Sequence, residues 1–559
     1  MLKIKDLTSD KKKLGLVISI AIILIGVIPL IIFTFYADPE KSYEIEATTL
    51  ISEDGTRIEA LIYKPKGISH EGIVVGHGYC GNKQYMQPLC IELVKRGFTV
   101  VNIDFRGHGS SDGRVLPSEH EHRYHGLMLD MEAGIDYLED IDDIEQIGLV
   151  GHSMGGQTAV ITSEENPDKI EATVSLGHIP NDDYDFEDIS NLLVAIGEYE
   201  QTYTKEDALD FLEEYTGKED VKIGVLYGDF DDGDACKVVI GKGSEHLAGN
   251  LNPTIVKEMV QWFELAFNGE EADDIELTLF YTQLFYRIAL IGVICLIFVL
   301  TVYFSNYLFK NELVYPEKQI IKDISIKNLC IYYLIGLFFV FFIFLEPLDL
   351  IFSSVTPIKN ADTMLALLLG TAISIIIIYY FLLRRERQGF RDIPSKLKLM
   401  CSTNPKLSLL YGFGTAILYT FSIAAISHWS NTATLPTIRE YLIMLYITAL
   451  FFPFILIKEF YFRTIQGRLN EPNRLKEYFK MTGLGIFIDN ILFIPVMVLL
   501  WGSDSLALAL TVVILFSIIQ QILVTWVYMH SGRNILGSTL FLCIFYAWMI
   551  INFYPFEYI

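Results

Sequence analysis

The sequence predicts an α/β domain, with a mostly parallel sheet covered by helices on both faces, tethered to a polytopic α-helical membrane domain. The chain of 559 residues is 52% apolar and its mean hydropathy is positive, as is typical of membrane proteins. Its charges are unevenly distributed, because Asp38–Glu276 contains 51 Asp and Glu but only 17 Lys and Arg. The remaining residues contain 17 acidic and 26 basic side chains. One long acidic segment therefore lies between apolar, mildly basic ones.

These observations divide the chain into three parts. We expect an N-terminal membrane anchor at residues 1–39, the α/β domain at 40–272 and the membrane domain at 273–559. The acidic surface of the middle part argues against nucleic acid as a partner. The seven cysteines are scattered without metal-ligand spacing and predict no disulfide framework.

The first apolar run, Leu14–Tyr36, has 23 residues without a charge and is long enough to cross a bilayer. It follows five lysines and is longer than the apolar core of a signal peptide, and the sequence after it offers no small-residue cleavage site. This pattern predicts an uncleaved anchor whose N-terminus lies in the cytoplasm.

Eight further apolar runs follow Glu276 and bring the expected number of membrane spans to about nine. These runs are 283–308, 329–347, 363–383, 407–427, 440–457, 483–501, 504–528 and 535–553. The N-terminus and the loops that this count assigns to the cytoplasm carry 23 Lys and Arg together, whereas the short loops assigned to the outside carry only Lys359 and Arg439. The bias predicts a multi-pass protein of the cell membrane with the α/β domain outside the cytoplasm.

The acidic segment begins with a predicted hairpin, because "YEIEATTLIS" and "RIEALIYKP" alternate with period two around an Asp-Gly turn. Six short β-rich runs follow, and helical patterns separate most of them. The runs are "GIVVGHG", "FTVVNID", "QIGLVGHS", "IEATVSLG", "NLLVAIG" and "CKVVIG". Apolar strands that alternate with helices indicate a parallel sheet buried on both faces.

Ser153 lies at the centre of "GHSMGG", directly after the strand "IGLV" and before a helical pattern. A Gly-x-Ser-x-Gly pattern in this context is typical of a nucleophile elbow, in which Gly151 and Gly155 permit a strained turn. The N-terminus of the following helix adds a positive partial charge near the hydroxyl. We therefore predict that Ser153 is a nucleophile.

Two other loops follow strand ends, and the first of them is expected to contribute to an oxyanion site. "GHGYCGN" (Gly76–Asn82) ends one strand, and its backbone is suited to face an oxyanion, with Tyr79 N–H and Met154 N–H as the two donors. His77 is then expected to order this loop. "DFRGHGSSDG" ends the next strand as a glycine-rich turn.

His246 follows the strand "CKVVIG" and precedes the last helix of the domain, which is where a general base belongs if the order is Ser, acid, His. We expect the acid in "NLLVAIGEYEQ", where Glu200 is preferred, Glu198 is the alternative, and Asp182 or Asp183 after the preceding strand is third. The aspartates of "YGDFDDGDAC" are interpreted as a solvated turn between two strand-like runs, "KIGVLYG" and "CKVVIG".

The stretches "GHGYCGN", "DFRGHGSSDG", "GHSMGG", "GEYE" and "EH" resemble the α/β-hydrolase superfamily, of the serine esterase, acyl-hydrolase and aminopeptidase-like type. The resemblance covers about 230 residues and implies the α/β-hydrolase fold. It implies the roles given above for Ser153, His246, Glu200, Tyr79 and Met154. The sequence departs from the family in having Glu where Asp is usual as the acid. It is also short where many relatives have a helical lid, which predicts an open cleft unless the membrane domain covers it.

The expected function is therefore a membrane-anchored serine hydrolase that cleaves an ester, thioester or amide bond of a small-molecule, lipid or peptide acyl substrate. Membrane lipids are its expected surroundings, and no metal or organic cofactor is required. "HEHRYH" nearly matches a His-x-His-x-Asp-His metal motif, but Tyr124 stands where Asp would, so a polar loop before a helix is the preferred interpretation. The alternative function is a ligand-binding or sensor domain of hydrolase fold coupled to a transport or signalling membrane domain.

The membrane half contains one further motif. "LIKEFYFRTIQGRL" resembles the Glu-Glu-x-x-x-Arg segment of the CAAX-protease and bacteriocin-processing family, with Lys458 in place of the first Glu and with Glu459 and Arg463 retained. That family also needs histidines within the membrane, whereas the histidines after Glu276 are expected in loops. If the relation holds, this half has lost metal-dependent chemistry. Asp489 and Asn490 are expected to be buried partners for Arg463 or another group.

Overall fold

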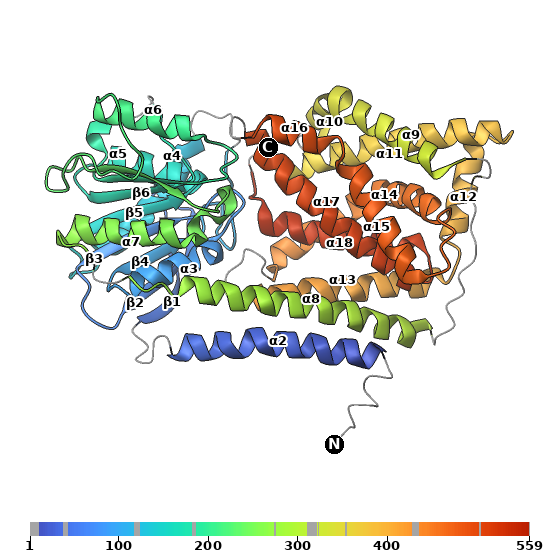
Figure 1. The fold of residues 1–559 in the computed structure, drawn as a ribbon, viewed down its shortest axis with the longest axis horizontal. Coiled ribbons are helices and arrows are strands. Elements are labelled where there is room, and N and C mark those ends of the chain that lie inside the picture. Colours follow the sequence, from blue (N-terminus) through green and yellow to red (C-terminus); the bar gives the residue numbers. More distant parts are fainter. Residues whose placement is uncertain are drawn as a thin grey trace, which may run out of the picture.

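A computed structural model of the chain describes residues 11–36, 43–116, 123–181, 186–272, 275–309, 321, 324–352, 355–427, 435–501 and 505–557. Figure 1 shows two bodies side by side, an α/β domain at the left and a helical membrane domain at the right. Two long helices, α2 (Lys11–Tyr36) and α8 (Leu279–Phe309), run along the lower side of Figure 1, from beneath the α/β domain to beneath the second body.

The α/β domain is built on one sheet of eight strands in the order β1-β2-β4-β3-β5-β6-β7-β8. The strands are β1 Tyr43–Ile51, β2 Arg57–Pro65, β3 Glu71–Gly76, β4 Thr99–Ile103, β5 Gln146–His152, β6 Ile170–Leu176, β7 Leu192–Gly197 and β8 Cys236–Gly241. β2 is antiparallel to β1 and to β4, and all other neighbours are parallel. All six β-rich runs of the sequence form strands, and the mostly parallel sheet is as predicted.

The predicted hairpin forms with Tyr43 opposite Pro65 and Ile51 opposite Arg57. The strand-like run before β8 is an exception, because it makes only an isolated antiparallel bridge between Tyr227 and Cys236. Its N-terminal part turns at Gly224, whose φ of 84° is a left-handed conformation that side chains disfavour. The expected strand "KIGVLYG" is therefore wrong, although the bridge retains the predicted antiparallel pairing with β8.

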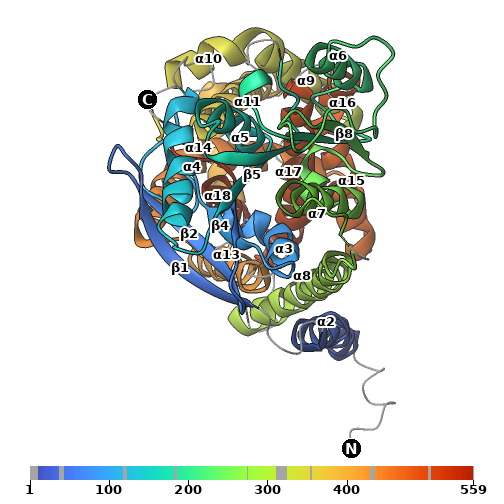
Figure 2. The ribbon, with the colours of Figure 1, turned by 90° about the vertical axis from the view of Figure 1, so that its left-hand side faces the viewer.

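Helices cover both faces of the sheet (Figure 2). They are α3 Lys83–Val94, α4 Arg123–Glu139, α5 Met154–Glu165, α6 Lys205–Thr216 and α7 Pro253–Asn268. Because side chains alternate along a strand, Ile73 and Val75 of β3 pack in the core beneath α3 and α7, while Val74 packs in the core beneath α4. This burial on both faces explains why the central strands are continuous apolar runs.

In its described residues, the membrane domain consists of helices and a π-helical turn, and the apolar runs predicted after Glu276 lie on them. They are α8, α9 Ile326–Phe339, the π-helical turn Val340–Phe344, α10 Leu345–Phe352, α11 Lys359–Arg385, α12 Ile393–Met400, α13 Pro405–Ser427, α14 Ile438–Gln466, α15 Arg474–Asn490, α16 Phe493–Leu499, α17 Ser505–His530 and α18 Ile535–Phe553. Among the described residues, seven helices are long and apolar enough to cross a membrane, and α15 with α16, bent by 50°, makes an eighth if the pair is one span. The apolar part of α2, Lys13–Pro29, is shorter than these.

Glycines bring α2 against α8, so that the two helices lie side by side in both views (Figures 1 and 2). A Cβ on Gly26 would lie 2.5 Å from the backbone nitrogen of Ala289, and a Cβ on Gly292 would lie 2.6 Å from that of Ile23. Small residues at such a crossing let two helix backbones approach closely within a bilayer. The expected anchor therefore packs on the membrane domain.

A similar contact between α13 and α18 gives a testable expectation. A Cβ on Gly412 would lie 2.2 Å from the carbonyl oxygen of Gly537, so Gly412→Ala must push the two helices apart. We expect this variant to lose about 1–3 kcal/mol of stability, which thermal unfolding of the purified membrane protein in mild detergent can measure. Gly483→Ala is the matched control, because Gly483 is an exposed helical glycine with no atom within 4 Å of a Cβ. Equal unfolding midpoints for the two variants would show that the close contact between α13 and α18 does not require glycine at position 412.

Two sequence expectations in the membrane half need correction. The charged residues after position 457 were expected in a loop, but α14 continues to Gln466 because buried polar contacts satisfy them inside the protein. His530, also expected in a loop, is the last residue of α17, and its Nδ1 contacts the carbonyl oxygen of Trp526 at 2.8 Å. His428 lies outside the described residues.

The segment after α18 joins the two bodies. Phe556 N–H donates to the carbonyl of Gly107, and Val115 N–H donates to the carbonyl of Phe556, each at 2.8 Å. Glu557 N–H donates to the carbonyl of Pro357 in the membrane domain at 3.0 Å. The loop that follows β4 is therefore held against the membrane domain by main-chain hydrogen bonds.

Candidate active site

Ser153 occupies a strained turn between β5 and α5. Its φ of 55° and ψ of −114° lie outside the regions that a serine ordinarily adopts. The turn is possible because a Cβ on Gly151 would lie 1.9 Å from the carbonyl oxygen of Gly155, and a Cβ on Gly155 would lie 2.5 Å from that of Gly76. Both glycines are thus required for the close approach of helix to strand that a nucleophile elbow needs.

His246 links Ser153 to Glu200. Its Nε2 lies 2.9 Å from Ser153 Oγ, and its Nδ1 lies 2.6 Å from Glu200 Oε1. His246 and Glu200 are both buried, whereas Ser153 is partly exposed. The carboxylate of Glu200 is held by the backbone N–H groups of Gln201 and Thr202, at 3.1 and 3.2 Å. Three residues from the ends of β5, β7 and β8 therefore form one hydrogen-bonded chain.

The other acid candidates lie elsewhere. Glu198 is exposed, and its carboxylate accepts a hydrogen bond of 2.8 Å from the backbone N–H of Gly243. Asp182 and Asp183 lie outside the described residues. The structure thus brings the preferred acid, Glu200, to the histidine and turns Glu198 toward a neighbouring loop.

The loop after β3 is held in place around Tyr79. His77 accepts a hydrogen bond from Phe105 N–H at 3.1 Å, and its Nδ1 contacts the carbonyl of Gly78 at 2.8 Å. His108 Nε2 lies 2.9 Å from the carbonyl of Tyr79. Burial lowers the pKa of His77 to about 4, so the ring orders the loop as a neutral imidazole. His77 thus has the ordering contacts that its position in the sequence predicts.

Met154 is the first residue of α5, where helix geometry leaves backbone N–H groups without an intrahelical carbonyl. The Tyr79 loop approaches the same turn, since a Cβ on Gly78 would lie 3.3 Å from the Cβ of Ser153. The backbone around Tyr79 and Met154 is therefore close to the serine, as an oxyanion site requires.

Two side chains of this region, those of Arg123 and Glu557, could not be predicted from the sequence. Arg123 is only 6% exposed, its Nη2 lies 3.8 Å from Met154 Sδ, and its guanidinium lies 5.1 Å from the centre of the Tyr79 ring. The Tyr79 hydroxyl donates to the carboxylate of Glu557, which raises the pKa of Tyr79 together with burial. Arg123 was assigned to a polar loop but begins α4, and Glu557 lies 478 residues after Tyr79 in the sequence. Neither position carries a local signal.

Buried neutral histidines predict that the domain is sensitive to acid. Burial lowers the pKa of His77 to about 4 and the pKa values of His108, His152 and His178 to about 3, whereas an unfolded histidine titrates near 6.5. Below pH 6.5 the unfolded chain therefore binds more protons, and the free energy of unfolding falls with pH. We expect the four histidines together to cost about 5 kcal/mol between pH 7.5 and 5.5, offset by about 1 kcal/mol from Asp130, whose pKa burial raises to about 6.

Hydrogen exchange of the β3 and β5 amides, corrected for intrinsic rates, measures this change. Asp104 does not contribute above pH 5, because Lys83 holds its pKa below the ordinary value despite burial. His178→Gln removes one of the four buried histidines and should lower the pH dependence by about a quarter. An unfolding free energy that is the same at both pH values would exclude the neutral histidines as its cause.

The metal expectation concerns a segment that is only partly described. His120 and His122 lie outside the described residues, and the helix expected after this loop begins at Arg123. Within the described part of the chain, His, Cys, Asp and Glu side chains form no group that could hold a metal ion.

Comparison with known proteins agrees with this architecture. Residues 68–195 match the family model described as serine aminopeptidase, S33. The domain has the α/β-hydrolase fold and is called the hydrolase domain for that reason. The match includes the strands β3 to β6, the Tyr79 loop and the serine turn, and it ends within β7, before the positions of Glu200 and His246.

The hydrolase domain is similar to curated proteins over short segments. It is 31% identical over 113 residues to a probable alcohol acetyltransferase of Cyberlindnera jadinii, which is 20% of this chain and 30% of that protein. It is 29% identical over 119 residues to the monoglyceride lipase of Homo sapiens, which is 21% of this chain and 38% of that protein. The chain thus spans less than half the length of either relative.

Among solved structures, an esterase of Pyrococcus furiosus aligns with the hydrolase domain at 18% identity and a TM-score of 0.32. The alignment covers 41% of this chain and 94% of that one.

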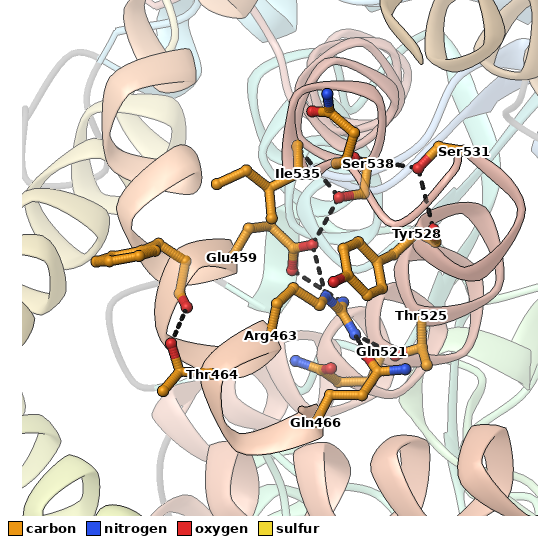
Figure 3. A network of polar contacts seen from close by, with 12 residues as sticks. Glu459, Arg463, Thr464, Gln466, Gln521, Thr525, Tyr528, Ser531, Ile535 and Ser538 are labelled. Atoms are coloured by element: carbon orange, nitrogen blue, oxygen red, sulfur yellow. Dashed lines mark hydrogen bonds and ion pairs between the residues drawn. The ribbon is translucent and has the colours of Figure 1, made fainter. Parts of the chain in front are cut away.

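The membrane domain contains a separate buried polar cluster (Figure 3). Arg463 donates to both carboxylate oxygens of Glu459, at 3.0 and 3.1 Å, and to Gln466 at 2.6 Å. Ser538 of α18 donates to Glu459 at 2.8 Å, and the guanidinium lies 4.7 Å from the centre of the Tyr528 ring of α17. A bidentate ion pair with these added hydrogen bonds ties α14, α17 and α18 together.

Asp489 is buried as expected, and of the two possibilities for its partner, Arg463 or another group, the structure shows the second. Asp489 binds Lys458 at 3.1 Å and accepts hydrogen bonds of 2.7 Å from Tyr333 and Gln521. The reason is helical spacing, because Glu459 lies four residues before Arg463 on the same face of α14 and satisfies its guanidinium. Lys458, at the position where the resembled family has its first Glu, therefore holds Asp489.

Proposed function

We propose that the hydrolase domain cleaves an ester, thioester or amide bond through an acyl-enzyme intermediate. The observation that carries this proposal is the position of His246, whose two ring nitrogens contact Ser153 Oγ and the Glu200 carboxylate at 2.9 and 2.6 Å. A nucleophile, a base and an orienting acid in hydrogen-bond reach of one another are what nucleophilic acyl transfer needs.

In the proposed reaction, Ser153 Oγ attacks the substrate carbonyl carbon while His246 Nε2 takes the hydroxyl proton. The tetrahedral oxyanion is stabilised by the N–H groups of Tyr79 and Met154, and removal of one such donor costs about 3–4 kcal/mol in comparable sites. His246 then gives its proton to the leaving group, which departs as the acyl-enzyme forms. A water molecule, deprotonated by His246, attacks the acyl carbon and releases the acid and Ser153.

Glu200 serves this cycle by holding His246. Its carboxylate accepts the Nδ1 proton, which leaves Nε2 free to accept the serine proton, and it stabilises the imidazolium that forms. The burial of both groups strengthens this interaction relative to one in water.

For the substrate we propose an acyl ester that reaches the site from the membrane, outside the cytoplasm. Ser153 follows the C-terminal end of β5. The loops at the C-terminal ends of the neighbouring strands β3 and β4 carry Tyr79 and Gly107, and both contact the segment after α18. The name of the human relative, a monoglyceride lipase, is in keeping with a lipid ester. The excess of Lys and Arg in the loops opposite the hydrolase domain supports the outside location.

The test is covalent labelling of the full-length protein with a fluorophosphonate probe, followed by mass spectrometry of the modified peptide. We expect the adduct on Ser153, and turnover of at least one member of a panel of monoacylglycerols, p-nitrophenyl esters and aminoacyl anilides. A folded protein that gives no adduct at Ser153 would refute the acyl-enzyme mechanism and leave a ligand-binding role.

The location has its own test. A membrane-impermeant fluorophosphonate should label intact cells as strongly as lysed ones. Labelling that appears only after lysis would place the hydrolase domain in the cytoplasm, without affecting the proposed chemistry.

A further inference from the structure

An apolar groove runs along the outer face of the membrane domain between α9 and α11, two helices that lie together in Figure 1. It has a volume of about 710 Å³. Its walls include Ile335 and Phe339 from α9 and Ile377 and Phe381 from α11, and each of these side chains is between 45% and 61% exposed. A hollow of this size, lined by large apolar side chains on a face of the membrane domain, is suited to hold hydrocarbon.

The groove has the depth of one leaflet of a bilayer. On α11 its lining extends from Ser374 to Arg385, which at the helical rise corresponds to about 16 Å. Half of a hydrocarbon core of ~30 Å is of the same length. The floor lies where the helices cross closely, because a Cβ on Gly336 would lie 3.0 Å from the Cβ of Ser374. The groove therefore begins near the middle of the membrane and opens at its surface.

Positive charge gathers at the open end. Arg384 and Arg385 line the groove there, both are exposed, and neither makes an ion pair with any described residue. Arg384 Nη1 donates to the hydroxyl of Tyr380 at 2.7 Å, and its guanidinium lies 5.8 Å from the centre of that ring. Tyr332 of α9 lines the groove as well. Arginines and tyrosines at the end of an apolar span are typical of the bilayer interface.

We propose that this groove is a binding site for an anionic phospholipid, with an acyl chain in the groove and the phosphate between Arg384 and Arg385. Guanidinium groups bind phosphate oxygens with good geometry, and basic pockets between membrane helices recognise acidic headgroups. Charge complementarity favours a lipid with a net negative headgroup over a zwitterionic lipid of the same chain length. The leaflet-deep groove favours a lipid over a soluble phosphate compound, which could not fill the apolar part.

The experiment is native mass spectrometry of the intact full-length protein released from nanodiscs of mixed phosphatidylglycerol and phosphatidylcholine. We expect the wild type to retain phosphatidylglycerol preferentially. The double variant Arg384→Gln/Arg385→Gln should lower phosphatidylglycerol retention on the order of tenfold, to the level of phosphatidylcholine. The matched control is Arg387→Gln/Arg391→Gln, which removes two exposed arginines nearby that do not line the groove and should retain the preference.

A second variant tests the apolar part. Ile335→Trp fills the groove at an exposed position and should lower retention of both lipids while leaving the arginines in place. An equal loss of phosphatidylglycerol retention in Arg387→Gln/Arg391→Gln would show that general surface charge, not the groove, holds the lipid, and would overturn the proposal. A stable dimer that Ile335→Trp dissociates would show that a second copy of the chain covers the groove, and would also overturn it. None of these measurements depends on hydrolase activity, so they stand apart from the proposed function.

Discussion

Ser153→Ala is expected to lower kcat for ester hydrolysis by about 10⁶-fold, as loss of the nucleophile does in other serine hydrolases. The hydroxyl is the atom that forms the acyl-enzyme, and alanine at this position leaves no group that His246 could activate. The variant enzyme would still bind substrate and present the oxyanion donors, so KM should change little. Steady-state hydrolysis of the best ester in the panel measures both quantities.

Ser190→Ala is the control for this variant. Ser190 is half-buried and lies just before the N-terminal end of β7, whereas Ser153 follows the C-terminal end of β5. Its rates should match those of the wild type. Substantial activity in Ser153→Ala, with the protein folded, would mean that another group performs the chemistry.

Glu200→Gln is expected to lower kcat by about 10⁴-fold. A glutamine amide can donate to Nδ1 of His246, and the ring then carries its proton on Nε2, where it cannot accept the serine proton. The variant keeps the size of the side chain, so the loss should appear in kcat and not in stability. Fluorophosphonate labelling at Ser153 should slow in parallel, because it depends on the same proton transfer.

Glu198→Gln gives the matched comparison. Glu198 is two residues away from Glu200, and its carboxylate accepts a hydrogen bond from the backbone N–H of Gly243. We expect a rate near that of the wild type. Equal rates for the two glutamine variants would move the acid to a residue outside the His246 contacts, with Asp182 and Asp183 as the next candidates.

Much of the hydrolase domain could be predicted because its signals are local. The apolar runs that form the central strands are continuous, since they are buried on both faces. Ser153, Glu200 and His246 lie in the loops that follow β5, β7 and β8. Ser153 was recognisable because a strained turn demands glycines at fixed spacing. Glu200 was preferred over Glu198 from the turn at Gly197 alone, and the structure places it against His246.

What could not be predicted depends on contacts between distant parts of the chain. The run before β8 has the composition of a strand, yet a turn at Gly224 and a single bridge at Tyr227 replace it, since regular strand pairing is decided by the neighbours and not by propensity. The charged end of α14 was expected in a loop because its buried partners, such as Ser538, lie on other helices. Arg123 acquires its position beside Met154 only when α4 packs on the sheet.

The main-chain hydrogen bonds that Phe556 forms, as donor to Gly107 and as acceptor from Val115, set an order of events during biosynthesis. The ribosome makes the hydrolase domain first, and domains of this kind fold as units while synthesis continues. The Tyr79 and Gly107 loops nevertheless receive their contacts with Glu557 and Phe556 only after every membrane helix has been synthesised and inserted. Completion of the site is thereby coupled to completion of the membrane domain, and an enzyme stalled halfway through insertion would have its nucleophile without the finished loops around it.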